Sequence, residues 1–599
     1  MDHFVDVLVV GGGAGGTAAA IQAARAGANT MLVSEYPWLG GMLTAAGVSA
    51  PDGNELVAFQ TGIWGAFLQE LYNRQPGGLH HAWVSFFTFD PSLGAAIFAD
   101  WVKELPNLDW IQEATPQAVL RQGDRITGVQ FENFSVQAQI TLDATELGDV
   151  LALGEIPHRW GWEWQSQWQE PSAPVSASSL TETYPVQAPT WVVVLQDYGE
   201  NAPEILPTPT WEPQRFEQAW AKHGAEPFLN YGRLPGNRFM INWPIHGNDY
   251  GEGVQRLVES ATARSQFLQE SRWHSQNFAR YIQLSLGRCY GLAKSLFPDL
   301  QNSLGGGGFA LYPYYRESRR LQGLTTIVEQ DLLPLTGGQV APLPRNDQGE
   351  VTAIALGNYP LDHHYPSGDI PLQPKSLRWG GNSTGTPYTI PYTALVPAQI
   401  DGLLVCEKNI SVSHMANGAT RLQPIVLGIG QAAGMAAALC IQHQCQPRDL
   451  PVRTLQESLL SDRQAPAAMI PLFNLPPDHP QWRDWQRYYL DHPEAYPLDG
   501  NCPAELPAQP AVFAGAAQTL AEFTGLFVRQ SHQNYTLTLA DGIPWQLITL
   551  NPQVNQQLQS YPSHQNLTLR GWSNPAGQWL QVHQIMGMIP NDSLPIDIP

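Results

Sequence analysis

The sequence predicts an α/β fold in which a Rossmann-like dinucleotide-binding domain carries an inserted α+β domain and is followed by a small all-β domain. Three observations lead to this fold class. A glycine-rich segment near the N-terminus joins a short apolar strand to a helix of small residues. A second apolar strand, followed by a helix rich in glycine and alanine, comes after residue 400. Strand-like segments alternate with turns over residues 506–599.

The N-terminal segment predicts a complete β-α-β unit. Residues 5–10 (VDVLVV) form the short apolar run typical of a strand buried on both faces of a parallel sheet. The glycine run 11–16 follows directly, and residues 17–26 then predict a closely packed helix. Residues 30–34 predict the second strand, which ends at Glu35.

The glycines of this unit match the G-x-G-x-x-G fingerprint of dinucleotide-binding folds. Gly11 permits the tight turn, Gly13 lets the backbone approach a pyrophosphate, and Gly16 allows close packing of helix on strand. The carboxylate of Glu35 can accept hydrogen bonds from ribose hydroxyls. A glycine-rich turn in an ordinary α/β domain is the alternative, whereas a P-loop is excluded because no Gly-Lys-Ser/Thr follows.

Two further elements favour FAD over NAD. Gly40, Gly41 and Met42 lie just beyond Glu35, where paired glycines let the backbone pass close to a bulky cofactor. A late strand at 402–405, the acid Glu407 and a helix at 422–442 containing Gly430 bring a second helix N-terminus to the same place. A long FAD molecule requires such a return, and an NAD domain does not. A second fingerprint for NAD(P)H is absent from the sequence.

These elements divide the chain into five parts. The middle is rich in Trp, Pro and Gln, and helices are expected near 253–270 and 273–296. The C-terminal segment is expected to be all-β, with a barrel as one arrangement. The parts are a FAD-binding domain (1–155), an inserted substrate or cap domain (156–330), the second part of the FAD-binding domain (331–450), a connector (451–505) and the small all-β domain (506–599).

Composition excludes several other classes of protein. The net charge is -22 and no basic run occurs, which argues against nucleic acid and anionic membrane surfaces as partners. The five cysteines include no Cys-x-x-Cys pair, as expected for a reduced cytoplasmic protein without a structural metal or a disulfide framework. The sequence shows no signal peptide, and no apolar run predicts a membrane span.

Several segments resemble FAD-dependent oxidoreductases related to the succinate dehydrogenase and fumarate reductase flavoproteins. They are residues 6–27, the DATELGD stretch 143–149, the RESRR stretch 316–320 and residues 428–439 (GIGQAAGMAAAL). The resemblance implies FAD as the cofactor. Its expected contacts are Gly11, Gly13, Ala14, Gly15, Gly16, Glu35, Gly40, Gly41, Met42, Ala144, Thr145, Asp149, Glu407 and Gly430.

The loop between the late strand and the glycine/alanine helix carries two of the three candidate catalytic residues. Loops at the carboxyl ends of strands are where open α/β sheets place ligand chemistry. His414 is the candidate base. The resemblance implies that Arg421 contacts a substrate carboxylate or stabilises a flavin anion, and the alternative for it is a buried salt bridge to Glu407.

The third candidate, Arg316, begins a charged stretch that includes Glu317. This stretch can line an anionic substrate site, or it can be a salt-bridged helix start on a solvated face. His363 and His364 are either acid/base groups or loop residues.

The predicted function is hydride transfer between a small organic substrate and flavin N5, with an electron acceptor that the sequence does not identify. One alternative is a flavin-bound interaction protein whose β-domain recruits a partner or a glycan. Another is a flavin monooxygenase or halogenase, which would need NAD(P)H or a reductase partner.

Overall fold

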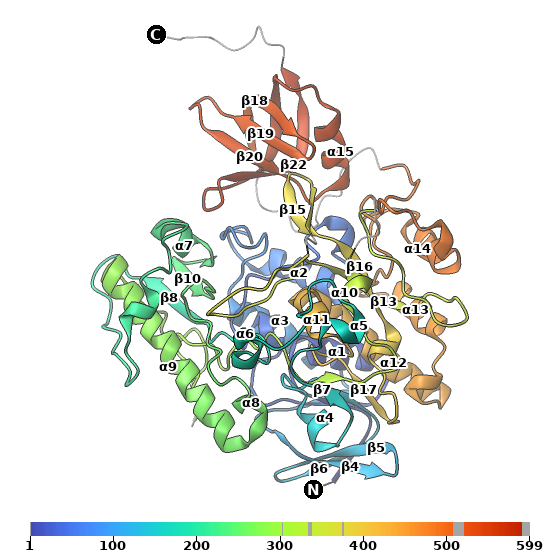
Figure 1. The fold of residues 1–599 in the computed structure, drawn as a ribbon. Coiled ribbons are helices and arrows are strands. Elements are labelled where there is room, and N and C mark those ends of the chain that lie inside the picture. The colour runs from blue at the N-terminus through green and yellow to red at the C-terminus, as the bar shows by residue number, and fades with distance from the viewer. Residues whose placement is uncertain (1, 302, 334–337, 374–375, 507–519, 590–599) are drawn as a thin grey trace, which may run out of the picture.

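The computed structural model describes residues 2–301, 303–333, 338–373, 376–506 and 520–589. Figure 1 shows a large body with a β-barrel at one end and the N-terminus at the opposite end. The body is built around a mostly parallel sheet, and the barrel follows it in the chain. The predicted fold class is confirmed.

The central sheet forms the Rossmann-like core. Its strands run in the order β3-β2-β1-β6-β5-β4, and β17 also pairs with β6. Asp143 at the end of β6 is in register with Val10 of β1 and with Val405 of β17, so three parallel strands end side by side. The strands are β1 (Asp2–Val10), β2 (Thr30–Val33), β3 (Leu108–Ile111), β4 (Pro116–Gln122), β5 (Arg125–Phe131), β6 (Ser135–Asp143) and β17 (Leu403–Val405).

Two helices, α1 (Ala14–Arg25) and α12 (Gln423–His443), pack against each other at backbone distance. A Cβ on Gly430 would overlap the carbonyl oxygen of Gly15, and one on Gly434 would overlap that of Ala19. Small residues are therefore required along this contact.

Among the described residues, α12 is long and apolar enough to cross a membrane by length and composition. In this fold, however, 89% of its most apolar window is buried. Its role here is that of a core helix.

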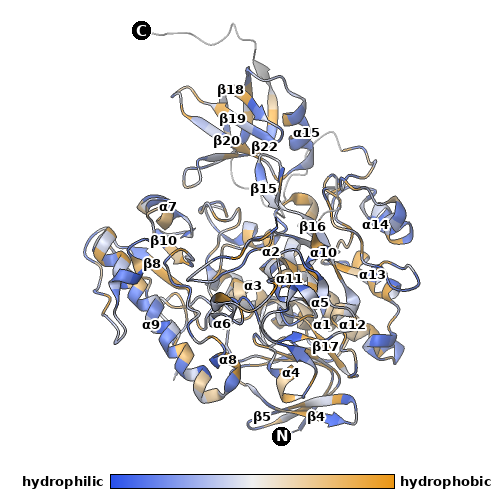
Figure 2. Cartoon of the chain, in the orientation of Figure 1, coloured by the Kyte–Doolittle hydropathy of each residue, from blue (hydrophilic) through white to orange (hydrophobic). Residues whose placement is uncertain are grey.

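The region between β6 and β17 contains a second, antiparallel sheet with the strand order β11-β8-β10-β9. Two helices were expected there, but the structure has one long helix, α9 (Ala261–Leu286). Neither Gly nor Pro interrupts residues 261–286 before Gly287. Figure 2 shows that α9 is largely hydrophilic, as expected for a helix with one face in solvent. The strands of this sheet are β8 (Val193–Asp197), β9 (Arg233–Leu234), β10 (Arg238–Ile241) and β11 (Tyr290–Leu292). The same region contains the short helices α7 (Ala225–Asn230) and α8 (Arg256–Glu259).

Shorter elements surround the sheet and lead to the barrel. Three two-stranded ladders are β7 (His158–Arg159) with β12 (Arg320–Leu321), β13 (Ala353–Asn358) with β16 (Pro387–Pro391), and the hairpin β14 (Ser376–Trp379) with β15 (Asn382–Gly385). The helices are α2 (Gly62–Arg74), α3 (Pro91–Lys103), α4 (Asp149–Leu153), α5 (Gln165–Trp168), α6 (Ser179–Thr183), α10 (Glu329–Leu332), α11 (His414–Thr420), α13 (Val452–Leu460) and α14 (Trp482–Asp491).

The C-terminal segment folds as a closed barrel around its own small hydrophobic core. The domain was expected to be all-β, but its described residues also contain a helix, α15 (Pro552–Ser560). Asn551 caps this helix by accepting hydrogen bonds from the N–H groups of Gln553 and Val554, and Pro552 occupies its first turn. The strands are β18 (Ala521–Ser531), β19 (Asn534–Thr538), β20 (Pro544–Ile548), β21 (Gln565–Asn574) and β22 (Trp579–Ile589).

Candidate cofactor and active site

The N-terminus of α1 is built to receive an anionic oxygen. The backbone N–H of Gly15 donates a hydrogen bond of 2.8 Å to Oε2 of Glu407, which follows β17. A Cβ on Gly13 would lie 2.5 Å from the same oxygen. Dinucleotide folds bind phosphate oxygens at this position, where helix N–H groups and the helix dipole converge.

The remaining glycines of the fingerprint keep the surrounding backbone close. A Cβ on Gly15 would overlap the carbonyl oxygen of Cys406, and one on Gly16 would overlap that of Gly11. Gly11 has φ +114°, a conformation that side chains rarely adopt. Gly41 lies over the fingerprint, since its Cβ would be 2.6 Å from the Cα of Gly13. A bulkier residue at any of these positions would open the cradle.

A buried cation that the sequence reasoning missed lies beside this cradle. Nζ of Lys408 is 2.5 Å from Glu146 and 3.0 Å from Glu407, and the lysine side chain is fully buried. Burial raises the pKa of Glu407 to about 7, although Lys408 opposes the shift. Tyr312 donates a 2.8 Å hydrogen bond to Glu146 from the other side. The position of Lys408 next to Glu407 in the sequence was the only available signal for it.

Other predicted cofactor residues lie at or near the same strand ends. Asp143 accepts hydrogen bonds from the backbone N–H and the hydroxyl of Thr145, and the N–H of Ala144 donates to Val10. Glu35 is solvent-exposed directly after β2. Gly40 and the buried Met42 accompany Gly41 over the cradle, and Ala14 begins α1.

Two of the predicted contacts have other partners in this fold. Asp149 forms ion pairs with Arg264 at 2.7 Å and with Arg319 at 2.9 Å. Gly430 lies against Gly15 rather than facing a cavity, so its missing side chain serves helix packing. Contact of either residue with FAD stays a prediction.

A second polar cluster surrounds His414, the first residue of α11. Its Nδ1 lies 2.8 Å from a carboxylate oxygen of Glu317, and its Nε2 lies 2.6 Å from the hydroxyl of Tyr365. The imidazole is buried against the indole of Trp162, with ring centroids 3.9 Å apart. Burial, together with the nearby Arg320 guanidinium, lowers the pKa of His414 to about 3. The imidazole is therefore neutral at neutral pH.

The hydrogen bonds continue beyond Tyr365. Its hydroxyl lies 3.0 Å from Nδ1 of His363, whose Nε2 lies 3.1 Å from the carbonyl oxygen of Met415. Burial also lowers the pKa of His363. A row of four hydrogen bonds thus runs from Glu317 through His414, Tyr365 and His363 to a backbone carbonyl.

The two predicted arginines both contact Tyr314. The guanidinium of Arg421 is 2.9 Å from Asp362 and donates a 2.6 Å hydrogen bond to the Tyr314 hydroxyl. Arg316 is 3.2 Å from Asp249, and its guanidinium carbon lies 4.9 Å from the Tyr314 ring centroid. The alternative partner for Arg421, Glu407, is wrong, because Asp362 from a distant loop reaches it instead.

His364 joins the two arginine–aspartate pairs. Its ring nitrogens lie 2.7 Å from Asp249 and 3.0 Å from Asp362. Arg316 is 1% exposed, and Arg320 further along the same stretch is fully buried between Glu163 and Glu317. The alternative of a solvated helix start for this stretch is therefore wrong.

The glycine cradle, the anion position at α1 and the acid after β2 fit the pyrophosphate and ribose of a dinucleotide. The sequence profile of the family described as FAD dependent oxidoreductase matches residues 6–459, which is more than half of the chain. The chain belongs to this family. FAD is its cofactor.

Solved structures of other flavoproteins are similar to parts of this FAD-dependent oxidoreductase. A geranylgeranyl bacteriochlorophyll reductase-like protein from Thermoplasma acidophilum is 10% identical over 77% of this chain and 84% of that chain, with a TM-score of 0.30. The myxobacterial chondrochloren halogenase is 11% identical over 76% and 78%, also with a TM-score of 0.30. Thioredoxin reductase from T. acidophilum is 18% identical over 24% of this chain and 35% of its own, with a TM-score of 0.15.

Proposed function

We propose that this protein oxidises a small organic substrate by removing a hydride from a C–H bond and a proton from the adjoining O–H or N–H. FAD, when bound, supplies the hydride acceptor at its N5. The residues of the chain then have to orient the substrate and accept its proton. We also propose a cytoplasmic location, an external electron acceptor and no nucleic-acid partner, in keeping with the acidic composition.

The proton count of the row around His414 is the observation that carries this proposal. Its four hydrogen bonds need four protons, one for each contact. With both imidazoles neutral, His414, His363 and the Tyr365 hydroxyl supply one proton each. The row is therefore one proton short, and the gain of a single proton completes all four bonds.

We assign His414 as the base that holds this proton. Glu317 orients the imidazole by accepting from Nδ1. Because the surroundings lower the pKa of His414 to about 3, the imidazolium that forms is short-lived and passes its proton on. The acceptor is then Nε2, which faces Tyr365. Protonation gives both ring nitrogens a hydrogen, so Tyr365 can turn its own hydroxyl hydrogen toward His363.

The arginines have a positioning role in this proposal. Arg421 and Arg316 each have an aspartate partner, which balances their charge before any substrate binds. The resemblance to succinate and fumarate flavoproteins implies instead that Arg421 contacts a substrate carboxylate. Among the described residues, the Nε atoms of Arg421 and Arg316 have no hydrogen-bond partner, so each can still donate one hydrogen bond.

Anaerobic titration of the purified yellow protein tests the reaction. Small alcohols, amines and hydroxy acids are added in turn, and loss of the oxidised flavin absorbance is followed. At least one of these classes should reduce the flavin without NAD(P)H. Reduction only by NAD(P)H, accompanied by oxygen-dependent product formation, would instead identify a monooxygenase or halogenase. Failure of every reductant would favour a flavin-bound interaction protein.

A pair of histidine variants tests the base. His414→Gln should retain FAD and slow flavin reduction by a factor on the order of 100, the usual size of a general-base contribution. His443→Gln, which alters an exposed histidine at the C-terminal end of α12, should behave as the unmodified protein. Equal reduction rates in the two variants would remove His414 from the reaction.

A further inference from the structure

The C-terminal barrel has a specific strand arrangement. Its order is β18-β19-β20-β22-β21, closed by pairing of β21 with β18, and β20 and β22 are parallel. The helix α15 lies between the third and fourth strands. This is the Greek-key arrangement of the OB-fold. In such barrels, the face of the second and third strands and the loops joining strands 1–2 and 4–5 bind oligonucleotides or oligosaccharides.

In this protein, the hairpin β14–β15 of the body contacts the third strand and the loop between the first and second strands. The N–H of Gly380 donates to the side chain of Gln533, in the first loop, at 2.9 Å. The N–H of Thr549, just after β20, donates to the carbonyl of Gly380 at 2.7 Å, and Gln546 donates to that of Gly381 at 3.0 Å. A Cβ on Gly381 would overlap the carbonyl oxygen of Leu547.

The loop joining strands 4 and 5 also contacts the body. Asn574 donates a 2.7 Å hydrogen bond to the carbonyl oxygen of Ala82, and Trp579 packs on Phe86 with ring centroids 5.7 Å apart. The chain just after β20 is held as well, because the N–H of Val57 donates to Leu550 at 3.0 Å. The third strand and both of the loops that bind ligands in OB-folds are therefore in contact with the body.

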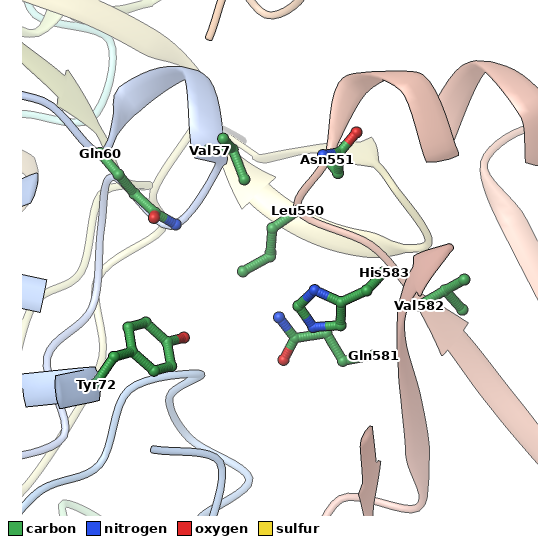
Figure 3. A pocket seen from close by; sticks show the side chains of 8 residues that line it. All are labelled: Val57, Gln60, Tyr72, Leu550, Asn551, Gln581, Val582 and His583. Atoms are coloured by element: carbon green, nitrogen blue, oxygen red, sulfur yellow. The ribbon is translucent and has the colours of Figure 1, made fainter. Parts of the chain in front are cut away.

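Figure 3 shows what space remains at this junction. Gln60 and Tyr72 from the body lie across a pocket from Gln581 and His583 of the barrel. Its volume is about 20 Å³, enough for about one water molecule. An unpartnered ring nitrogen of His583 and an unpartnered oxygen of Gln60 suit such a water. A polymer does not fit there.

The charge of the barrel also disfavours nucleic acid. Its described residues include two cations, Arg529 and Arg570, and no lysine. Arg570 pairs with Glu522 at 2.6 Å, and Arg529 donates to two backbone carbonyls. A surface that binds a phosphate backbone needs several unpaired cations.

We propose that the hairpin β14–β15 is the resident ligand of the OB-fold face, and that the barrel thereby braces the active-site segment 359–365. The hairpin contacts this segment directly. The Cα of Gly385 lies so close to the backbone of Tyr359 that a Cβ would overlap it, and Asn358 donates to Thr384 at 2.9 Å.

The braced segment supplies side chains to both polar clusters. Asp362 from this segment pairs with Arg421, and Tyr365 contacts His414. The effect of the brace on turnover rests on the proposed function, whereas its effect on the order of the segment does not.

A glycine pair provides the test. Gly381→Val places a branched side chain against β20, and Gly542→Val introduces the same strain at a barrel turn with nothing within 4 Å. The two φ angles are similar, +87° and +78°. Both variants are made in the full chain with FAD bound. Amide hydrogen exchange of residues 359–365 should rise about tenfold or more in Gly381→Val and stay unchanged in Gly542→Val.

Unchanged exchange of residues 359–365 in a folded Gly381→Val protein overturns the brace. If that variant does not fold, Gln546→Ala removes one side-chain hydrogen bond to the hairpin and should raise the same exchange by a smaller factor. Faster exchange with an unchanged rate of flavin reduction would uphold the brace and overturn the assigned role of His414 and its neighbours.

A binding assay addresses the other occupants of OB-fold faces. A fluorescent single-stranded oligothymidine and a chitin hexasaccharide are titrated with the native holoprotein. Neither should bind, because the face is already covered. Binding of either probe that is lost in Gln546→Ala would overturn the proposal.

Discussion

The cofactor cradle and the polar clusters around His414 and Arg421 are built on different principles. The cradle is made of backbone: glycines permit close approach, and helix N–H groups provide the binding site. The clusters are made of long side chains from segments far apart in the chain, such as Glu317, Tyr365 and Asp362. The cradle should therefore respond to added volume, and the clusters to the loss of single polar atoms.

The largest effect is expected in the cradle. Gly13→Val places a side chain where Glu407 and the cofactor approach α1, and bound flavin should fall at least about tenfold. The ratio of flavin to protein absorbance in purified material measures this. Gly27→Ala is the control: its φ of +97° strains an added side chain, but nothing lies within 4 Å of the position, so stability should fall slightly while flavin content stays unchanged. Full flavin content in Gly13→Val would show that the fingerprint has been misinterpreted.

In the clusters, Arg421→Ala should lower stability more than flavin content. It removes the ion-pair partner of Asp362 and a donor to Tyr314. The expected loss is about 2 kcal/mol in the free energy of unfolding, below the usual cost of breaking a buried pair because the Asp362 side chain is 36% exposed. Denaturant titration measures it. A colourless but equally stable variant would place Arg421 in the cradle instead.

A smaller effect is expected when the hydroxyl group in the middle of the row is lost. Tyr365→Phe deletes the hydroxyl between His414 and His363 while keeping the ring that contacts Trp162. Flavin reduction by substrate should slow about tenfold, with FAD content unchanged. Stopped-flow absorbance gives the rate. An unaltered rate would mean that the proton reaches His414 without Tyr365.

The pH dependence of stability should show the weakest effect. The pKa of His414 is about 3 in the folded protein, against 6.5 for an unperturbed histidine such as that of an unfolded chain. The unfolded chain therefore binds more protons in this interval. The contribution of His414 to stability is fully present above pH 6.5 and is lost as the pH falls towards 3, by about 1.4 kcal/mol per pH unit at most. Denaturation at about pH 7 and about pH 5.5 should show a smaller loss in His414→Gln than in the unmodified protein.

The difference between these regions also decides what the sequence could predict. The cradle depends on residues 11–16 and 35–42, which are local and contiguous, so spacing alone indicated it. His414 was identified from its place after a strand, but its partners were not. Glu163, which accepts from the His414 N–H, is 251 residues away, and no local pattern reports such a contact.

The fold shows the same division. The β-α-β unit, the return at β17 and the strands of the barrel followed from hydrophobic patterns. The single helix α9 and the helix α15 did not, although an Asn-Pro pair marks the start of α15. The buried position of Lys408 could not be predicted, because a lysine beside a glutamate in the sequence usually indicates an exposed surface.

The glycine contact between α1 and α12 sets a fixed length in this molecule. Gly430 and Gly434 meet Gly15 and the carbonyl of Ala19 without intervening side chains, so α12 cannot slide along α1 without a clash. The N-terminus of α1 and the residues that precede α12 are therefore held at a constant separation. Any group that contacts both ends therefore meets a spacing that backbone contact has fixed.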